Sequence, residues 1–447
     1  MRIDITSGGN STQKIQNAID ECFLAGGGEV RLEKGDHYSG GLRLRSNVTL
    51  RLLSGARLIG SRNPEDYYVL AGDEIEPIPE TDMTDMTWDY ASSSPDAEEP
   101  SVLRYAGSRW NNAIIRLVYA RNAAIIGEEG SEIDGCDPYD ELGEENYRGP
   151  HGINAFYCEN IIFSGYTIKN TGNWAHAVFH STNLDFSGIT VLAGHDGIHI
   201  TDCENVRIRD CGFYTGDDCV AGFANRNITV RNCELNTACS AFRFGGTNVF
   251  VEKCHIFGPA RYVFRGSLTK EEKISGAHPK DDGKHRFNML SLFTYYADHT
   301  FNIPVAPGNI IISDCRVENV DRFLHFNYSG NERWQKNRPL EEITFTGIVA
   351  TGISMPLTAY GDKTARLTLR FIHSSIDFSE KVDVPFMHVA NYKMLEISDL
   401  RIRRSGSSPL ILSWGGDGTF AAENVVCTSG ESIAITPADI PFVCSSI

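Results

Sequence analysis

The chain has 447 residues, of which 41% are hydrophobic and 22% are charged, a composition that excludes a disordered polypeptide or a short disulfide-stapled scaffold. Its 58 acidic residues against 41 basic ones give a formal net charge of −17, so it offers no basic surface for nucleic acid or anionic membranes. An acidic polymer would need a local basic pocket.

The beginning of the chain predicts where the protein resides. Residues 1–6 lack the apolar stretch of a signal peptide, and no run approaches the roughly 18 apolar residues of a membrane span. We therefore expect a cytoplasmic protein, with removal of a leader as the alternative. Twelve cysteines could form disulfides, but none occurs in a C-x-x-C pair, which favours free thiols in a reducing compartment.

The first predicted element is a helix. Ser11 or Thr12 can cap a helix that runs to about Leu24, and Gly26 begins a glycine run that ends it. One face of the helix is apolar and consists of Ile15, Ala18, Ile19, Cys22 and Phe23. Because the ends of repetitive folds need capping, we expect residues 1–45 to form an N-terminal cap. The segment 64–100 is acidic and contains five prolines, which predicts a long surface excursion.

A repeat dominates the middle of the chain. Each repeat opens with an asparagine, has apolar residues one and three positions later, and carries Gly or a polar residue five positions later; the opening residues are Asn160, Asn183, Asn205, Asn227, Asn248 and Asn309. The steps between the first five asparagines are 23, 22, 22 and 21 residues. Apolar residues in alternation indicate strands with one buried face.

A period of about 22 residues with strand-like alternation predicts an all-β fold, a parallel β-helix. Each position of the repeat then becomes a column along the axis. Four cysteines six residues after their asparagines, Cys211, Cys233, Cys254 and Cys315, should form an interior stack rather than a metal or disulfide site. The asparagines should form a ladder of stacked amides at a turn.

Looser strand-like stretches continue beyond residue 340, so we expect a single β-helix domain over residues 1–447. The interval from Asn248 to Asn309 is 61 residues, one repeat plus a surplus rich in Lys and Arg. We therefore expect a second long insertion at residues 266–302. Loops of this length are typical of functional segments.

Column arithmetic predicts a polar site. Thirteen residues after the first five asparagines come Asn173, Asp196, Asp218, Ser240 and Arg261, and Asp217 precedes Asp218. Sixteen residues after them come His176, His199, Ala221, Arg243 and Phe264, with Arg265 beside the last. Carboxylates about one coil apart raise one another's pKa, which is typical of functional sites, although an Asp pair alone is also common in plain turns. Glycosidic bond cleavage needs two carboxyl roles, one acid and one base.

Two motifs in this region resemble those of a known family. Gly194-His195-Asp196-Gly197 and Gly216-Asp217-Asp218-Cys219 resemble the Asn-Thr-Asp-Gly and Gly-Asp-Asp-Cys motifs of the polygalacturonase family, glycoside hydrolase family 28. The likeness spans about residues 5–350. It implies a right-handed parallel β-helix, hydrolysis of galacturonide-type substrates with inversion, and no metal or other cofactor. It also implies that Asp217 is the general acid and that Asp196 and Asp218 hold the attacking water.

The chain departs from the family pattern at several positions. Gly194 and His195 replace Asn and Thr, the family's Gly-His-Gly falls near Cys239-Ser240-Ala241, and no Arg-Ile-Lys motif follows. The resemblance implies that these missing residues bind the uronate and support the acid. His199 or His176 could replace the histidine, and Arg243 with Arg265 could supply the positive charge, because Arg suits a bidentate carboxylate contact. Trp174 is a further candidate for sugar binding.

The leading hypothesis is an exo-acting glycoside hydrolase that cleaves α-linked units from pectin-type or related oligosaccharides, since long insertions can close one end of a groove. A second hypothesis is a polysaccharide lyase in which the acidic cluster binds Ca²⁺ and Arg243 or Arg265 abstracts a proton. A third is a non-catalytic β-helix that binds glycans through Trp174, Tyr262 and Tyr328. The sequence leaves the sugar, the linkage and the oligomeric state open.

Overall fold

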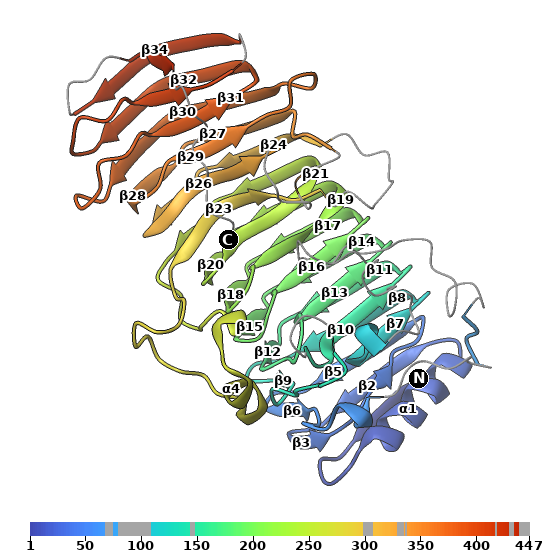
Figure 1. The fold of residues 1–447 in the computed structure, drawn as a ribbon. Helices are drawn as coiled ribbons and strands as arrows, with labels where there is room; N and C mark the ends of the chain where they lie inside the picture. The colour runs from blue at the N-terminus through green and yellow to red at the C-terminus, as the bar shows by residue number, and fades with distance from the viewer. Residues whose placement is uncertain are drawn as a thin grey trace.

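The computed structural model describes residues 1–67, 75–78, 109–143, 148–297, 307–328, 335, 338–415, 418–428 and 433–437. In these ranges the chain winds as a right-handed parallel β-helix, and each rung stacks on the one before it (Figure 1). The fold class predicted from the 22-residue period is confirmed. No helix of the described part has the length and apolar character that crossing a bilayer requires.

The rungs form three faces of parallel strands. Face A contains β4 (Leu42–Arg43), β7 (Ala113–Val118), β10 (His151–Phe156), β13 (His176–Phe179), β16 (Ile198–Thr201), the first parts of β19 (Val220–Arg231) and β21 (Ser240–Glu252), β23 (Met289–Tyr295), β26 (Val320–Asn327), β29 (Leu357–Tyr360), β31 (Met387–Ala390), β33 (Ile411–Ser413) and β35 (Ile435–Pro437).

Face B contains β1 (Arg2–Ile5), β2 (Gly28–Leu32), β5 (Val48–Leu52), β8 (Arg121–Gly127), β11 (Glu159–Ser164), β14 (Thr182–Ser187), β17 (Glu204–Arg209), the later parts of β19 and β21, β24 (Gly308–Ser313), β27 (Glu342–Thr346), the first parts of β30 (Leu367–Phe378) and β32 (Tyr392–Arg403), and β34 (Thr419–Cys427). Face C contains β3 (Gly35–Tyr38), β6 (Ala56–Ile59), β9 (Glu132–Asp134), β12 (Thr167–Lys169), β15 (Thr190–Leu192), β18 (Gly212–Thr215), β20 (Glu234–Thr237), β22 (His255–Phe257), β25 (Arg316–Glu318), β28 (Val349–Ile353) and the ends of β30 and β32.

Two α-helices accompany the strands in the described part of the chain. Helix α1 (Thr12–Leu24) follows Ser11 as predicted, and Ile15, Ala18, Ile19 and Cys22 on its apolar face are buried against β1, β2, β4 and β5 at the first rungs. Helix α4 (Lys270–Ser275) lies in the loop after β22, with Thr269 and Glu272 forming a capping box. Three short 3₁₀ turns are η1 (Pro64–Asp66), η2 (Arg109–Asn111) and η3 (Arg265–Ser267).

The second insertion is shorter than predicted. The range 266–302 includes β23, which pairs with β21 and β26 on face A and is therefore a rung strand. The error arises because the column count assumed that the extra residues directly precede Asn309, whereas they lie between β22 and β23. Most of the predicted excursion at 64–100 lies outside the described residues, apart from 64–67 and 75–78.

The asparagine ladder is confirmed. Each ladder residue has a left-handed φ of 52 to 60°, and each Nδ2 from Asn122 onwards donates to the Oδ1 of the preceding one at 2.8 to 3.2 Å; the members are Asn47, Asn122, Asn160, Asn183, Asn205, Asn227, Asn248 and Asn309. Asn suits this turn because its short polar side chain tolerates the left-handed region. The predicted cysteine stack is buried in the core, where Cys211, Cys233, Cys254 and Cys315 are free thiols.

We expect Asn205→Ala to lower the free energy of unfolding by about 2 kcal/mol, because it removes two amide hydrogen bonds and forces alanine into a left-handed conformation. Asn205→Gly loses the same bonds without the strain and should cost less. Urea denaturation of both variants measures the difference. Equal losses would show that the amide, and not the backbone conformation, accounts for the preference for asparagine.

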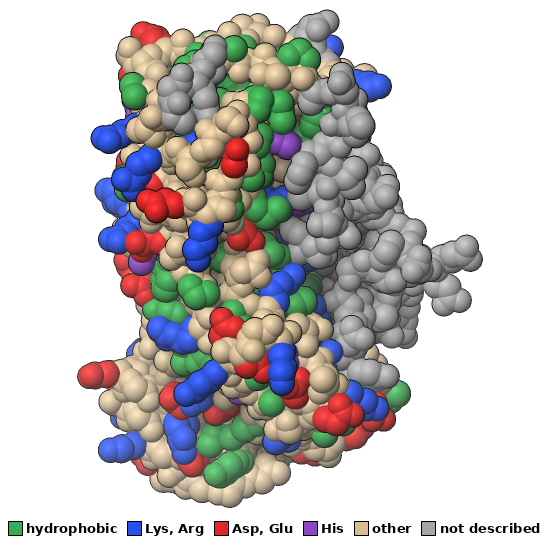
Figure 2. All heavy atoms as spheres, turned by 60° about the vertical axis from the view of Figure 1, so that its left-hand side comes forward, with side chains coloured by type: hydrophobic (Ala, Val, Ile, Leu, Met, Phe, Trp, Pro, Cys, Tyr) green, Lys and Arg blue, Asp and Glu red, His purple; other side chains and the backbone are tan. Residues whose placement is uncertain are grey.

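Surface charges of both signs alternate along the axis on the face shown in Figure 2. On face B, charged residues pair between neighbouring rungs, as Arg231 does with Glu252 at 3.2 Å and Arg370 with Glu396 at 3.3 Å. Such exposed pairs contribute little to stability, about 0 to 1 kcal/mol each. The fold is therefore held mainly by the apolar column inside the rungs.

Candidate active site

Three aspartates lie on the turns that connect face C to face A in two consecutive rungs. Asp196 lies between β15 and β16, and Asp217 with Asp218 between β18 and β19. The backbone N–H of Gly197 donates to the carbonyl of Asp218 at 2.9 Å, so the two turns are neighbours. The structure therefore brings together the three carboxylates that the sequence predicts.

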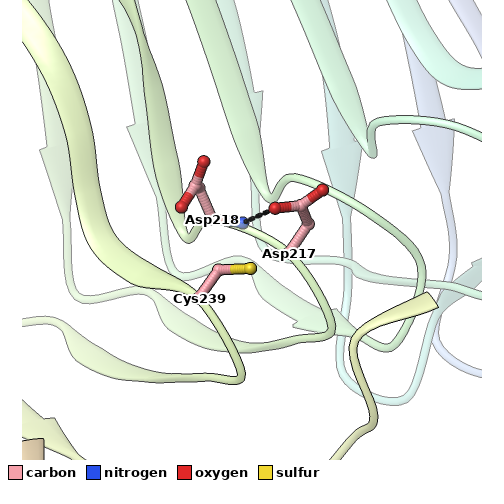
Figure 3. Close-up of side chains that lie close together, drawn as sticks. All are labelled: Asp217, Asp218 and Cys239. Carbon is pink, nitrogen blue, oxygen red and sulfur yellow. Dashed lines mark hydrogen bonds between the residues drawn. The ribbon is translucent and has the colours of Figure 1, made fainter. Parts of the chain in front are cut away.

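Cys239, on the turn of the next rung, joins this group (Figure 3). A carboxylate oxygen of Asp217, one of Asp218 and the Sγ of Cys239 all lie within 4.8 Å of one another. Asp217 Oδ1 accepts a hydrogen bond from the backbone N–H of Asp218 at 3.1 Å, and Asp218 Oδ1 accepts one from the N–H of Ser240 at 2.9 Å. These backbone contacts fix the direction of both carboxylates.

Asp196 is held by a histidine and a tryptophan. His199 Nδ1 is hydrogen-bonded to Asp196 Oδ2 at 2.8 Å, and the imidazole stacks on the Trp174 ring with a centroid distance of 3.7 Å and an interplanar angle of 4°. His199 is 1% exposed and Trp174 2%. Both residues were predicted to bind substrate; the structure places His199 in contact with Asp196, whose carboxylate it orients, and Trp174 in contact with His199.

Burial changes the protonation of two of the carboxyl groups. Burial, followed by the negative charge of Asp217, raises the pKa of Asp218 to about 7. Burial and the charges of Asp217 and Asp218 raise the pKa of Asp196 well above its ordinary value. The site therefore retains protons near neutral pH that the same groups would release in water.

A raised pKa predicts how stability depends on pH. The native protein retains the Asp218 proton up to about pH 7, whereas the unfolded chain releases it near pH 4, so the native state binds more protons in between. Stability should therefore fall as pH rises from 4 to 7. Asp218→Asn removes this contribution, and the difference in Tm between the variant and the wild type should grow in the variant's favour across that range. A difference that is constant with pH would contradict the raised pKa.

The structure does not place the two predicted histidines at the same position of successive rungs, because the alignment is shifted by one residue. Strand pairing aligns His176 with Ile198 and Ala177 with His199. The 23-residue step from Asn160 to Asn183 causes this slip, and a slip of one residue turns a side chain to the opposite face. His176 consequently points into the core, where Nε2 contacts the Tyr166 hydroxyl at 2.9 Å and Nδ1 the Gly197 carbonyl at 3.0 Å. The prediction that His176 binds substrate is wrong.

The same one-residue shift means that Asn173 is not the equivalent of Asp196 in the preceding rung. The register places Asn173, His195, Asp217 and Cys239 on successive turns. The side chains of Asn173 and His195 are 1% and 8% exposed. Among the described residues, Asn173 Oδ1, Asn173 Nδ2 and His195 Nδ1 find no hydrogen-bond partner. Because buried polar atoms are nearly always paired, these orphans beside Asp217 indicate the position of a polar ligand or of water.

Sequence reasoning missed Arg148. Its Nη2 lies 3.6 Å from Asp217 Oδ2, and its side chain comes from the loop between β9 and β10. No sequence signal marked this arginine, because the loop lies outside the repeat. It places a positive charge beside the carboxylate that the family resemblance makes the general acid.

The two arginines predicted to bind substrate have protein contacts. Arg265 is 5% exposed and pairs through Nη1 with Asp137, which also contacts His278 Nε2 at 2.8 Å. Arg265 therefore joins two loops, and its charge is neutralised. The Arg243 guanidinium lies 4.5 Å from the centre of the Tyr296 ring on face A, in the strand register of His199 and Ala221. Arg243 thus lies on face A, three residues after Ser240, whose backbone N–H binds Asp218.

The acidic cluster does not fit Ca²⁺ well. Asp217, Asp218 and Cys239 are the only group of metal-type donors close to one another in the described ranges. Ca²⁺ takes six to eight oxygen ligands, whereas the third donor here is sulfur. Burial raises the pKa of the Cys239 thiol well above its ordinary value, and Arg286 Nη2 lies 2.7 Å from its Sγ. A neutral thiol beside a guanidinium is a poor ligand for a cation.

The fold and the site define the chain as a parallel β-helix protein with a carboxylate cluster on its rung turns. Within that class, residues 103–239 match the family model described as Glycosyl hydrolases family 28, a range that includes Asp196, Asp217 and Asp218. The resemblance predicted from the sequence motifs is confirmed.

Two plant relatives and one solved structure illustrate the similarity. A probable polygalacturonase from Vitis vinifera is 28% identical over 222 residues, which cover 47% of this chain and 40% of the relative. A polygalacturonase from Medicago sativa is 30% identical over 173 residues, covering 37% of this chain and 34% of the relative. The chain thus spans less than half the length of these relatives. The exopolygalacturonase of Thermotoga maritima shares the fold, with a TM-score of 0.62, 15% identity, and coverage of 96% of this chain and 92% of that one.

Proposed function

We propose that this protein is a glycoside hydrolase that cleaves α-glycosidic bonds in pectin-type oligosaccharides. The observation that carries the proposal is the cluster of Asp196, Asp217 and Asp218 on adjacent turns, within the segment that matches family 28. The polygalacturonases among the relatives support a uronate-containing substrate. No cofactor takes part in the proposed reaction.

The arrangement suggests a division of roles. The three carboxyl groups share the protons that the cluster retains, and Asp217, the most exposed of them at 9%, passes one to the leaving oxygen, with Arg148 beside it. Asp196 and Asp218, each buried and hydrogen-bonded, hold the attacking water on the opposite side, and the one of the pair that is ionised activates it. Inversion needs room for that water, and acid and base groups are typically about 6.5 to 9.5 Å apart in inverting enzymes. Because oxygens of Asp217 and Asp218 lie within 4.8 Å, Asp196 is the better candidate for the principal base.

The loop after β22 supports exo action. Helix α4 follows β22 in the chain but reaches the loops that follow β6 and β9 (Figure 1), where Lys270 contacts Glu141 at 3.2 Å and Arg62 Nη2 donates to the Ile274 carbonyl at 2.7 Å. Together with the Arg265–Asp137 pair, these contacts fix the loop along the flank of the site toward the N-terminal rungs. A wall at one end of a groove admits a chain end rather than a long polymer.

The test is incubation with galacturonate oligomers of defined length and with neutral galactose oligomers, followed by product analysis. The proposal predicts saturated monosaccharide released from a chain end of the uronates. An unsaturated, ultraviolet-absorbing product that disappears with a chelator would instead identify a lyase. Binding without any product would identify a non-catalytic glycan-binding protein. We also propose a cytoplasmic location and a single β-helix domain.

A further inference from the structure

The loop between β22 and β23 brings three arginines to the flank of the site: Arg261, Arg265 and Arg286. Two of them have other contacts. Arg265 is neutralised by Asp137, and the exposed Arg261 lies 3.8 Å from the centre of the Tyr214 ring on face C. Arg286 differs from both in its surroundings.

The guanidinium of Arg286 is held in place without a carboxylate. It lies 3.9 Å from the centre of the Phe264 ring, and Nη2 lies 2.7 Å from Cys239 Sγ. Among the described residues, no acidic side chain lies within salt-bridge distance of it, and its Nε is buried without a hydrogen-bond partner. The half-buried guanidinium is therefore oriented by an aromatic ring and a neutral thiol, neither of which carries a charge.

Arg286 also lies close to the carboxylates of the site. Cys239 Sγ, which Arg286 contacts, lies within 4.8 Å of oxygens of both Asp217 and Asp218. The negative charge of this cluster would repel an acidic sugar, so an acidic substrate binds there only if a fixed positive charge faces it. Arg presents parallel N–H donors that match the two oxygens of a carboxylate.

We propose that Arg286 is the specificity-determining residue of the site and binds the carboxylate of a uronic acid residue next to the bond that is cleaved. This inference rests on the proposed function and names the group that selects the acidic sugar. Arg286 thereby carries out the charge recognition that the sequence analysis assigned to Arg243 and Arg265. The thiol of Cys239 and the Phe264 ring position the guanidinium.

The test measures binding in the Asp217→Asn background, where turnover is slow. Trigalacturonate and its carboxyl-reduced, neutral counterpart are titrated by calorimetry into that protein and into the same protein carrying Arg286→Gln. We expect Arg286→Gln to weaken trigalacturonate binding by about 10- to 100-fold, the range for a lost hydrogen bond to a charged group, and to leave binding of the neutral sugar unchanged. Arg286→Lys should restore part of the affinity. Arg261→Gln serves as the matched control, because Arg261 belongs to the same loop and stacks on the ring of Tyr214, and this variant should bind both sugars as before.

Each outcome has one interpretation. Equal affinities for trigalacturonate with and without Arg286 would overturn the inference, and so would equal losses for the acidic and neutral sugars. Wild-type protein that binds trigalacturonate without cleaving it would overturn the proposed function, while the Arg286 comparison would still be decided by binding. Wild-type protein that does not bind trigalacturonate would contradict both.

Discussion

Asp217→Asn should lower kcat by about 10²- to 10⁴-fold while leaving the fold intact, the range expected when a general acid is removed. Asparagine keeps an oxygen that can accept the N–H of Asp218, so the turn retains its hydrogen bond. What is lost is the proton for the leaving oxygen and the carboxylate beside Arg148. The measurement is the rate of reducing-sugar release from trigalacturonate, with thermal unfolding as the check on folding.

A matched control separates the loss of the acid from the loss of any negative charge. Asp185 lies on β14 of face B, where it contacts Arg209 at 3.3 Å. Asp185→Asn removes one charge from the same protein and should leave kcat unchanged. An Asp217→Asn protein with wild-type activity would remove Asp217 from the mechanism.

Gly222→Ala should destabilise the protein by about 3 kcal/mol or more, the largest stability effect that we expect from so small a change. Gly222 lies in β19, four residues after Asp218, with a φ of 127° that side chains rarely adopt. A Cβ there would lie 1.6 Å from the carbonyl oxygen of Ile200 on the preceding rung. Neither strand can move without disturbing the rung that carries the carboxylates.

The control for Gly222 is Gly212 at the start of β18. Its φ is not in the left-handed region, and the nearest atom to an added Cβ is a ring carbon of Tyr214 at 3.3 Å, which can shift. Gly212→Ala should change stability by only about 0.5 kcal/mol. Urea denaturation of both variants provides the comparison. Similar stabilities of the two variants would contradict the steric account of the bend in β19.

The repeat made the fold and part of the site predictable. The asparagines were recognisable because the turn needs a left-handed residue and the ladder needs its amide, and both requirements recur in every rung. Once the period was known, Asp196 and Asp218 had to lie on neighbouring turns, because parallel rungs stack like positions on like positions. The carboxylates were therefore found from spacing alone.

The remainder of the site depends on features that spacing does not report. A single extra residue between Asn160 and Asn183 shifted His176 from the outer surface to the core, because the side-chain period of a strand is two. Arg148 and Arg286 come from loops outside the repeat, so no column contains them. The distinct surroundings of Arg265 and Arg286 also depend on tertiary contacts, with Asp137 in one case and with Phe264 and Cys239 in the other.

The most direct test of the account is a time-resolved proton NMR spectrum of trigalacturonate mixed with the protein. If Asp217 protonates the leaving oxygen while Asp196 and Asp218 direct water from the opposite side, the first new anomeric signal will be that of the β-anomer, followed by slow mutarotation. Initial appearance of the α-anomer, of an unsaturated product, or of no product would contradict that account.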